Sequence, residues 1–188
     1  MAEKKPLRYK VNGDIACVLT NKDELFLISS SDVDLLSCSW SLSKAGYLYG
    51  GYPKRVLLHK LISKRMGFKP ILESDHINRT PLDCRRTNLR PATSRLNKLN
   101  RLWSKANTSG VYGVRKHKVS GWIAAIGPIQ KWFADINEAA LYRQRLLEQE
   151  IAKEIEIAKK LNDPSLDLES QGTYTALTPA DEAPLKTP

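Results

Sequence analysis

Residues 74–97 read SDHINRTPLDCRRTNLRPATSRLN, and this stretch decides the fold of the central part of the chain. The run ILESDHI (71–77) predicts a strand, and TNLRPAT (87–93) predicts a second strand after a proline-containing loop. The segment SRLNKLNRLWSK (94–105) then continues as a helix with one apolar face. The predicted order is strand, loop, strand, helix, which is a ββα unit too small to be a domain by itself.

Asp75 and His76 stand side by side at the end of the first predicted strand. Hydrolysis of a phosphodiester needs a base that takes a proton from water and a cation that neutralises the phosphate charge. An imidazole can be that base near pH 7, and oxygen ligands hold hard divalent cations. Asn97 lies about one turn into the predicted helix, where its amide oxygen could complete a metal site with Asp75. The alternative is a capped loop with a solvated histidine.

The run DHINRTPLDCRRTNLRPATSRLN resembles the HNH nuclease motif in the form found in phage and group I intron homing endonucleases. This resemblance implies a ββα-metal site that holds one Mg²⁺ or Mn²⁺, with Asp75 and Asn97 as metal ligands and His76 as the general base. It also implies that Asn88 braces the loop and so orients His76. WSLSKAGYLY and LLHKLI resemble the segment that precedes this motif in the same group, so the resemblance covers about residues 10–104.

The net charge of +10 is concentrated in the centre of the chain. Residues 52–118 contain 17 basic and 3 acidic side chains, whereas residues 1–51 and 119–161 are balanced and residues 162–188 carry a net charge of −4. Such a block indicates a polyanionic partner, although a solvated basic face is the alternative. Six basic residues near the predicted site are expected to hold DNA phosphates: Arg85, Arg86, Arg90, Arg95, Lys98 and Arg101.

The segments SGVYGVRKHKVSGWIAAI (109–126) and KWFADINEAALYRQ (131–144) resemble, more loosely, the ethylene-response-factor type of DNA-binding domain. This resemblance implies a three-stranded sheet packed on one helix, with the sheet in the DNA major groove. The residues that it implies at the DNA are Arg115, Lys116, Lys118 and Trp122, with Lys131 as a further candidate. Both Trp122 and Trp132 could instead belong to the core of this module, and for Trp132 we favour the core.

Together with the two resemblances, the remaining patterns predict an α+β protein in four parts. These are a β-rich N-terminal region (1–55), the ββα-metal nuclease unit (56–104), the DNA-binding module (105–150), and a helix end with a disordered acidic tail (151–188). NTSG (107–110) is expected to be a hinge between the nuclease unit and the DNA-binding module. The run LLHKLISKRMGF predicts a short helix, in which His59 is either a core residue or a contributor to the site.

The three cysteines, Cys17, Cys38 and Cys84, form no CxxC pair, which argues against a zinc ribbon or a disulfide framework. Cys84 stands where the resemblance leads us to expect an asparagine. No apolar run approaches the roughly 18–20 residues that cross a bilayer, and the first residues lack the apolar stretch of a secretory signal. We therefore expect a cytoplasmic protein in a bacterial host cell, without zinc or membrane contact.

These expectations converge on a site-specific DNA endonuclease of the homing type that binds double-stranded DNA. One ββα unit contains one active site, so a monomer is expected to nick, and a double-strand break would need a dimer or two successive events. A DNA-binding regulator that keeps the fold without cleavage is the main alternative. A structure-selective or RNA-directed nuclease is a third possibility, disfavoured because the A-form major groove is too narrow for a sheet.

Overall fold

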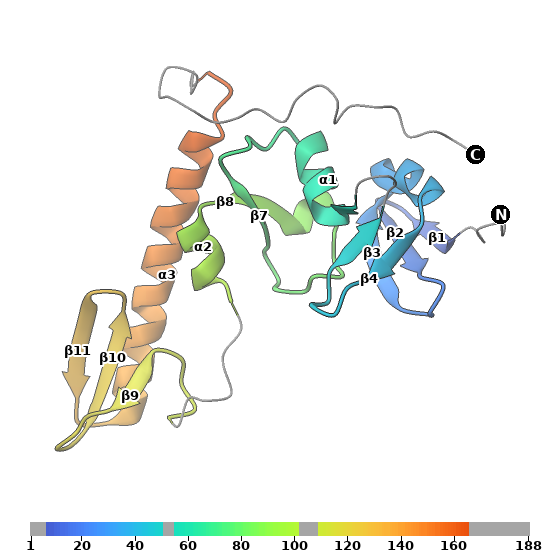
Figure 1. Cartoon of the computed structure of the whole chain (residues 1–188). Helices are drawn as coiled ribbons and strands as arrows, with labels where there is room; N and C mark the ends of the chain where they lie inside the picture. The colour runs from blue at the N-terminus through green and yellow to red at the C-terminus, as the bar shows by residue number, and fades with distance from the viewer. Residues whose placement is uncertain (1–6, 51–54, 102–108, 166–188) are drawn as a thin grey trace.

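The computed structural model describes residues 7–50, 55–101 and 109–165. Within them the chain is an α+β protein with several small antiparallel sheets and a long C-terminal helix (Figure 1). The predicted acidic tail from residue 166 and the first two residues of the predicted hinge (107–108) lie outside the described residues. No helix in the described part is both long and apolar enough to cross a membrane.

Two small sheets form the N-terminal region. The first has the order β1-β2-β3, and the second has the order β4-β5-β6. Their strands are β1 (Arg8–Asn12), β2 (Ile15–Leu19), β3 (Leu25–Ser29), β4 (Trp40–Leu42), β5 (Leu48–Gly50) and β6 (Val56–Leu57). A 3-10 helix, η1 (Ser30–Ser37), connects the two sheets, and α1 (Leu58–Arg65) follows β6.

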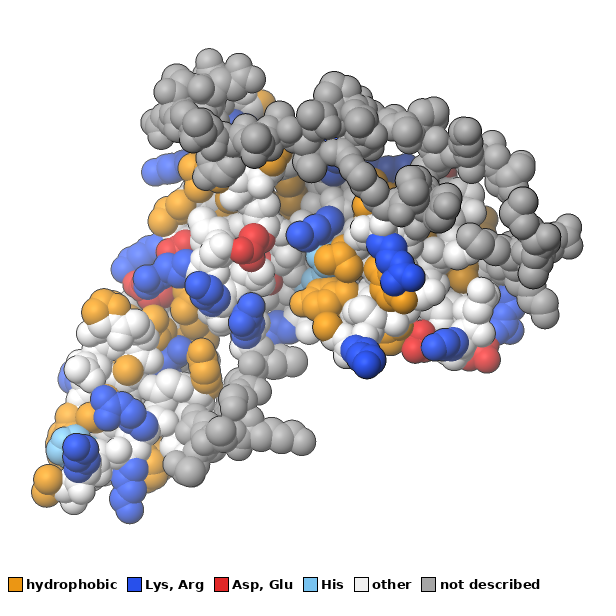
Figure 2. All heavy atoms as spheres, in the orientation of Figure 1, with side chains coloured by type: hydrophobic (Ala, Val, Ile, Leu, Met, Phe, Trp, Pro, Cys, Tyr) orange, Lys and Arg blue, Asp and Glu red, His pale blue; other side chains and the backbone are white. Residues whose placement is uncertain are grey.

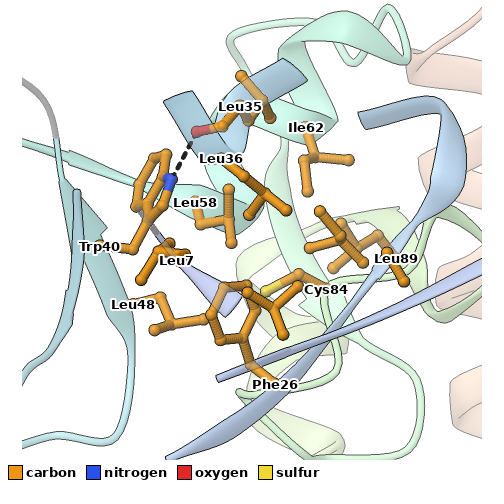
Figure 3. Close-up of a cluster of buried hydrophobic side chains, with 13 residues drawn as sticks. Leu7, Phe26, Leu35, Leu36, Trp40, Leu48, Leu58, Ile62, Cys84 and Leu89 are labelled. Carbon is orange, nitrogen blue, oxygen red and sulfur yellow. Dashed lines mark hydrogen bonds between the residues drawn. The ribbon is translucent and has the colours of Figure 1, made fainter. Parts of the chain in front are cut away.

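A single hydrophobic core joins both sheets to α1 and to the centre of the chain (Figure 3). Phe26 and Leu48 come from the sheets, Leu58 comes from α1, and Cys84 and Leu89 come from the ββα segment. Because these side chains lie on both sides of the predicted boundary at residue 55, that boundary passes through one core. The N-terminal region and the central unit therefore support one another.

The central segment has the predicted order of strand, loop, strand and helix. Its elements are β7 (Glu73–His76), the 3-10 turn η2 (Arg86–Asn88), β8 (Leu89–Ala92) and α2 (Ser94–Leu99). Strands β7 and β8 pair antiparallel, and the hydroxyl of Thr93 caps α2 by accepting a hydrogen bond from the Leu96 amide. Helix α2 ends at Leu99 and is shorter than predicted, because the buried side chain of Asn100 turns back to β7.

The C-terminal sheet has the order β11-β10-β9 and is covered on one face by a single helix (Figure 1). Its elements are β9 (Val114–Lys116), β10 (Trp122–Ile126), β11 (Ile129–Phe133) and α3 (Ile136–Leu161). The side chain of Asp135 caps α3 by accepting hydrogen bonds from the amides of Asn137 and Glu138. Gly113 has a φ of +72°, and a Cβ there would collide with Arg143 of α3.

Helix α3 belongs to two parts of the molecule at once. Its first half packs on the β9–β11 sheet, and its second half lies along α2 and β8 (Figure 1). The predicted boundary at residue 150 therefore divides one continuous helix of 26 residues.

Candidate functional site

Asp75 is a buried carboxylate between β7 and α2, with 5% of its surface exposed. Its Oδ2 accepts a hydrogen bond of 2.8 Å from Nε of Arg90. The amide nitrogen of Asn100 donates to both carboxylate oxygens, at 2.9 and 3.0 Å. The β7–β8 hairpin and α2 thus hold this acid in one place.

His76 follows Asp75 on β7 and lies on the opposite side of the strand, against α1 and the loop before β8. Its ring centroid is 4.9 Å from that of His59 and 6.2 Å from that of Tyr47. Burial lowers the pKa of His76, and the nearby carboxylates of Asp75 and Asp83 partly oppose this shift. The imidazole is therefore neutral near pH 7, which is the form that accepts a proton.

Asn88 holds the loop that follows His76. Its side-chain oxygen accepts a hydrogen bond from the Asn78 amide at 3.0 Å, and its backbone oxygen accepts one from the Ile77 amide at 2.9 Å. Its Nδ2 donates to Asn78 Oδ1 and to the backbone oxygen of Asp83. Asn88 therefore anchors the two residues directly after His76.

The structure brings Asn97 to Glu73 and not to Asp75. The Asn97 amide donates to the Glu73 carboxylate, whereas Asn100, almost one turn further along the chain, donates to Asp75. Two acid–amide pairs therefore lie between β7 and α2. Glu73 and Asn100 were not predicted as site residues. Their positions carry a signal, however: Glu73 and Asp75 are two residues apart on a strand and so share one face of it. Asn97 and Asn100 are three residues apart and so lie on the same side of the helical turn.

The candidate metal ligands on the face of β7 that meets α2 are the side-chain oxygen atoms of Glu73, Asp75 and Asn97. Such hard oxygen ligands suit Mg²⁺ or Mn²⁺. In the described residues, no group of three or more His, Cys, Asp or Glu side chains is arranged to hold a metal ion. A cation bound here would therefore have few protein ligands and complete its shell with water and phosphate oxygens. Burial raises the pKa of the Cys84 thiol, near His76, to about 12, so it stays protonated and is a poor zinc ligand.

Four of the six basic residues predicted to hold phosphates form ion pairs with carboxylates. The pairs are Arg85 with Asp83, Arg86 with Asp32, Arg90 with Asp75, and Arg95 with Glu150 and Glu154. The partners of Arg86 and Arg95 are 54 or more residues away, so the local sequence does not reveal them. Lys98 and Arg101 are exposed and form no ion pair within the described part of the chain.

The outer face of the β9–β11 sheet, away from α3, has a shallow groove of about 410 Å³. Its lining includes Arg115, His117, Lys118, Ile123, Gln130 and Trp132. Lys and Arg side chains are spread over the visible face of both the C-terminal sheet and the central unit (Figure 2).

The two tryptophans of this sheet lie on opposite faces. Ile123 pairs with Trp132, whereas Trp122 pairs with Phe133 and packs against the core on the α3 side. The prediction that Trp132 belongs to the core is wrong, because 49% of its surface is exposed on the outer face. Lys116, the neighbour of Trp122 on β9, is on the same side as Trp122.

Comparison of the chain with known proteins identifies no relative. The chain matches no protein-family model, no curated protein and no solved structure. Function is therefore inferred from the acid–histidine end of β7, the oxygen donors that face α2, and the basic groove of the C-terminal sheet.

Proposed function

We propose that the protein is a metal-dependent DNA endonuclease of the HNH homing type, with His76 as its general base. The observation that carries this proposal is the pairing of Asp75 and His76 at the end of β7. The carboxylate faces the amides of α2, while the buried imidazole faces α1. The alternative of a solvated histidine in a loop is disfavoured, because His76 is buried and Asn88 holds the loop that follows it.

The residues divide the reaction between them. His76 takes a proton from a water molecule while the oxygen of that water forms a bond to phosphorus. The bond between phosphorus and the leaving sugar oxygen breaks. Asn88 keeps the loop after His76 in place, and solvent supplies the proton to the leaving oxygen. Asp75 and Asn97, with Glu73 beside them, would hold a divalent cation, which would supply charge neutralisation at the phosphate and the leaving oxygen.

The C-terminal sheet is the DNA-reading part of this proposal. Arg115, Lys118 and Trp132 line its outer groove, and an arginine there can pair with guanine O6 and N7 in the major groove. Trp122 is assigned to the core instead. Of the six predicted phosphate-binding residues, Lys98 and Arg101 are exposed and form no ion pair within the described residues. They remain available for phosphates, so binding should weaken with salt.

The second candidate is a DNA-binding regulator that has this fold without cleavage. The ion pair between Arg90 and Asp75 favours it, because Arg90 occupies a carboxylate oxygen that a cation would use. Both candidates use the basic groove to bind DNA. They differ in whether Asp75 binds a cation and His76 activates water.

Incubation with supercoiled plasmid carrying the DNA that flanks the protein's own gene separates the two candidates. The nuclease should convert the plasmid to nicked circles with Mg²⁺ or Mn²⁺ and stop when EDTA removes the metal. A protein that binds this DNA tightly and never nicks it in either metal is the regulator.

A further inference from the structure

Arg95 fastens α2 to the second half of α3. Its Nη2 lies 2.5 Å from Oε2 of Glu150, and its Nε lies 3.1 Å from Oε1 of Glu154. The two glutamate side chains are only 9% and 11% exposed. Arg95 thus pairs with two largely buried carboxylates one turn apart, and Lys153 of α3 also pairs with Glu150.

Two further hydrogen bonds hold the same end of α3. The hydroxyl of Thr93, which precedes α2, donates to Oε2 of Glu154 at 2.6 Å. The backbone amide of Lys69 donates to the side-chain oxygen of Asn162 at 2.9 Å. The end of α3, from Glu150 onward, is thus attached to the central unit at several points.

The first half of α3 is attached to the C-terminal sheet. Ala139 is fully buried against Val114 and Ala124, and Nε of Arg143 donates to the backbone oxygen of Ala125 at 2.9 Å. The helix contains no glycine or proline between its two attached halves, so nothing in its sequence introduces a kink. A helix of 26 residues is about 39 Å long.

We propose that α3 is a rigid spacer that fixes the position of the β9–β11 groove relative to the Asp75–His76 site. This inference rests on the proposed function and deepens it, because it makes the distance from the bound sequence to the cut a property of the helix. A molecule joined only by a flexible hinge would cut over a range of positions. A molecule with this spacer cuts at one position.

The middle of α3 offers a matched pair of variants. Glu148 and Gln149 are exposed between the two attached halves. Glu148→Gly with Gln149→Gly introduces a flexible joint, whereas Glu148→Ala with Gln149→Ala removes the same side chains and keeps the helix stiff. Arg95→Ala removes the ion pairs that join α2 to Glu150 and Glu154 of α3, and Arg145→Ala removes an exposed arginine of α3 as its control.

Two measurements on the full chain test the spacer. The first maps the cut position on target DNA and the nicking rate on plasmid without the target. The second measures the distance distribution between spin labels at Lys22→Cys and Val119→Cys, with Cys17→Ser and Cys38→Ser in the background. We expect one cut position and a narrow distribution for the wild type and for the alanine and Arg145→Ala controls.

The glycine pair and Arg95→Ala should spread the cuts over several nucleotides and broaden the distance distribution. The glycine pair, which lies outside the proposed DNA contacts, should also keep nicking of plain plasmid within about threefold of wild type. Single-position cutting by both variants, or a broad distribution in the wild type, would overturn the spacer. A wild type that nicks no DNA overturns the proposed function and the spacer's role in cutting, while a narrow label distribution would still report a stiff α3.

Discussion

At the scale of single residues, the buried histidine pair makes stability depend on pH. Burial, with a smaller contribution from His76, lowers the pKa of His59 from 6.5 to about 3. The unfolded chain therefore binds a proton that folded His59 rejects, so this contribution to stability is full above pH 6.5 and is lost as the pH falls towards 3.

Between pH 7 and 5, His59 alone should lower the free energy of unfolding by about 2 kcal/mol. Carboxylates with lowered pKa values titrate below this window, so they do not obscure the effect. Urea unfolding at both pH values checks it. His59→Phe keeps an aromatic ring without a titrating group and should show a flatter pH dependence, and an unchanged slope would contradict the assignment.

Arg90 and Arg8 offer a comparison of a buried and an exposed ion pair. Asp75 and Arg90 have side chains 6% and 16% exposed, whereas those of Asp23 and Arg8 are 75% and 71% exposed. Arg90→Ala leaves a buried carboxylate poorly compensated and should cost about 3 kcal/mol in urea unfolding. Arg8→Ala should cost less than about 0.5 kcal/mol. Equal, small losses would show that Asp75 does not depend on Arg90.

The two asparagines of this region should separate stability from chemistry. Asn100 donates to Asp75 and to the backbone oxygen of His76, and its oxygen accepts from Nε of Arg79, so Asn100→Ala should cost about 2–3 kcal/mol. Asn97→Ala breaks its hydrogen bond to a carboxylate near the surface and should unfold almost like wild type. Because Asn97 is a proposed metal ligand, that variant should nevertheless stop cleaving. Full cleavage by Asn97→Ala would show that Asn97 is not a metal ligand.

At the scale of elements, hydrophobic patterning and chain breakers were enough to predict the strand–loop–strand–helix order around Asp75. The start of α2 was predicted as well, because the predicted helix and the observed helix both begin at Ser94. The early end of α2 was not visible, since it depends on the side chain of Asn100 reaching another element. Local sequence reports a helix start better than a helix end that is set by tertiary contacts.

The two tryptophans show the same limit in a sheet. Trp122 and Trp132 occupy strands with apolar residues on both sides, so alternation did not indicate which one faces α3. The strand pairing, with Phe133 opposite Trp122, decides it. A change of one residue in register moves every side chain to the other face, and the sequence alone did not determine that register.

At the scale of the whole molecule, α3 changes the predicted division into modules. The sequence suggested a nuclease unit (56–104) and a separate DNA-binding module (105–150) joined by a hinge. The structure instead packs α3 on α2 and β8 and pairs Arg95 with Glu150 and Glu154. Such long-range ion pairs leave no local pattern in the sequence.

A chain ending at residue 105 should therefore lose stability as well as site preference. It exposes the α3-facing sides of α2 and β8 and leaves Arg95 without its two carboxylates. We expect its urea midpoint to fall well below that of the full chain, measured by circular dichroism. An unchanged midpoint would show that the central unit folds independently of α3.

The central claim is that His76 performs proton transfer in DNA cleavage, and the most direct test is His76→Ala. Cleavage of supercoiled target plasmid and affinity for the same DNA are measured together in Mg²⁺, with urea unfolding as the check on folding. The account predicts a loss of cleavage of about 10²–10⁴-fold with DNA affinity unchanged. A folded His76→Ala protein that cleaves like wild type would contradict it.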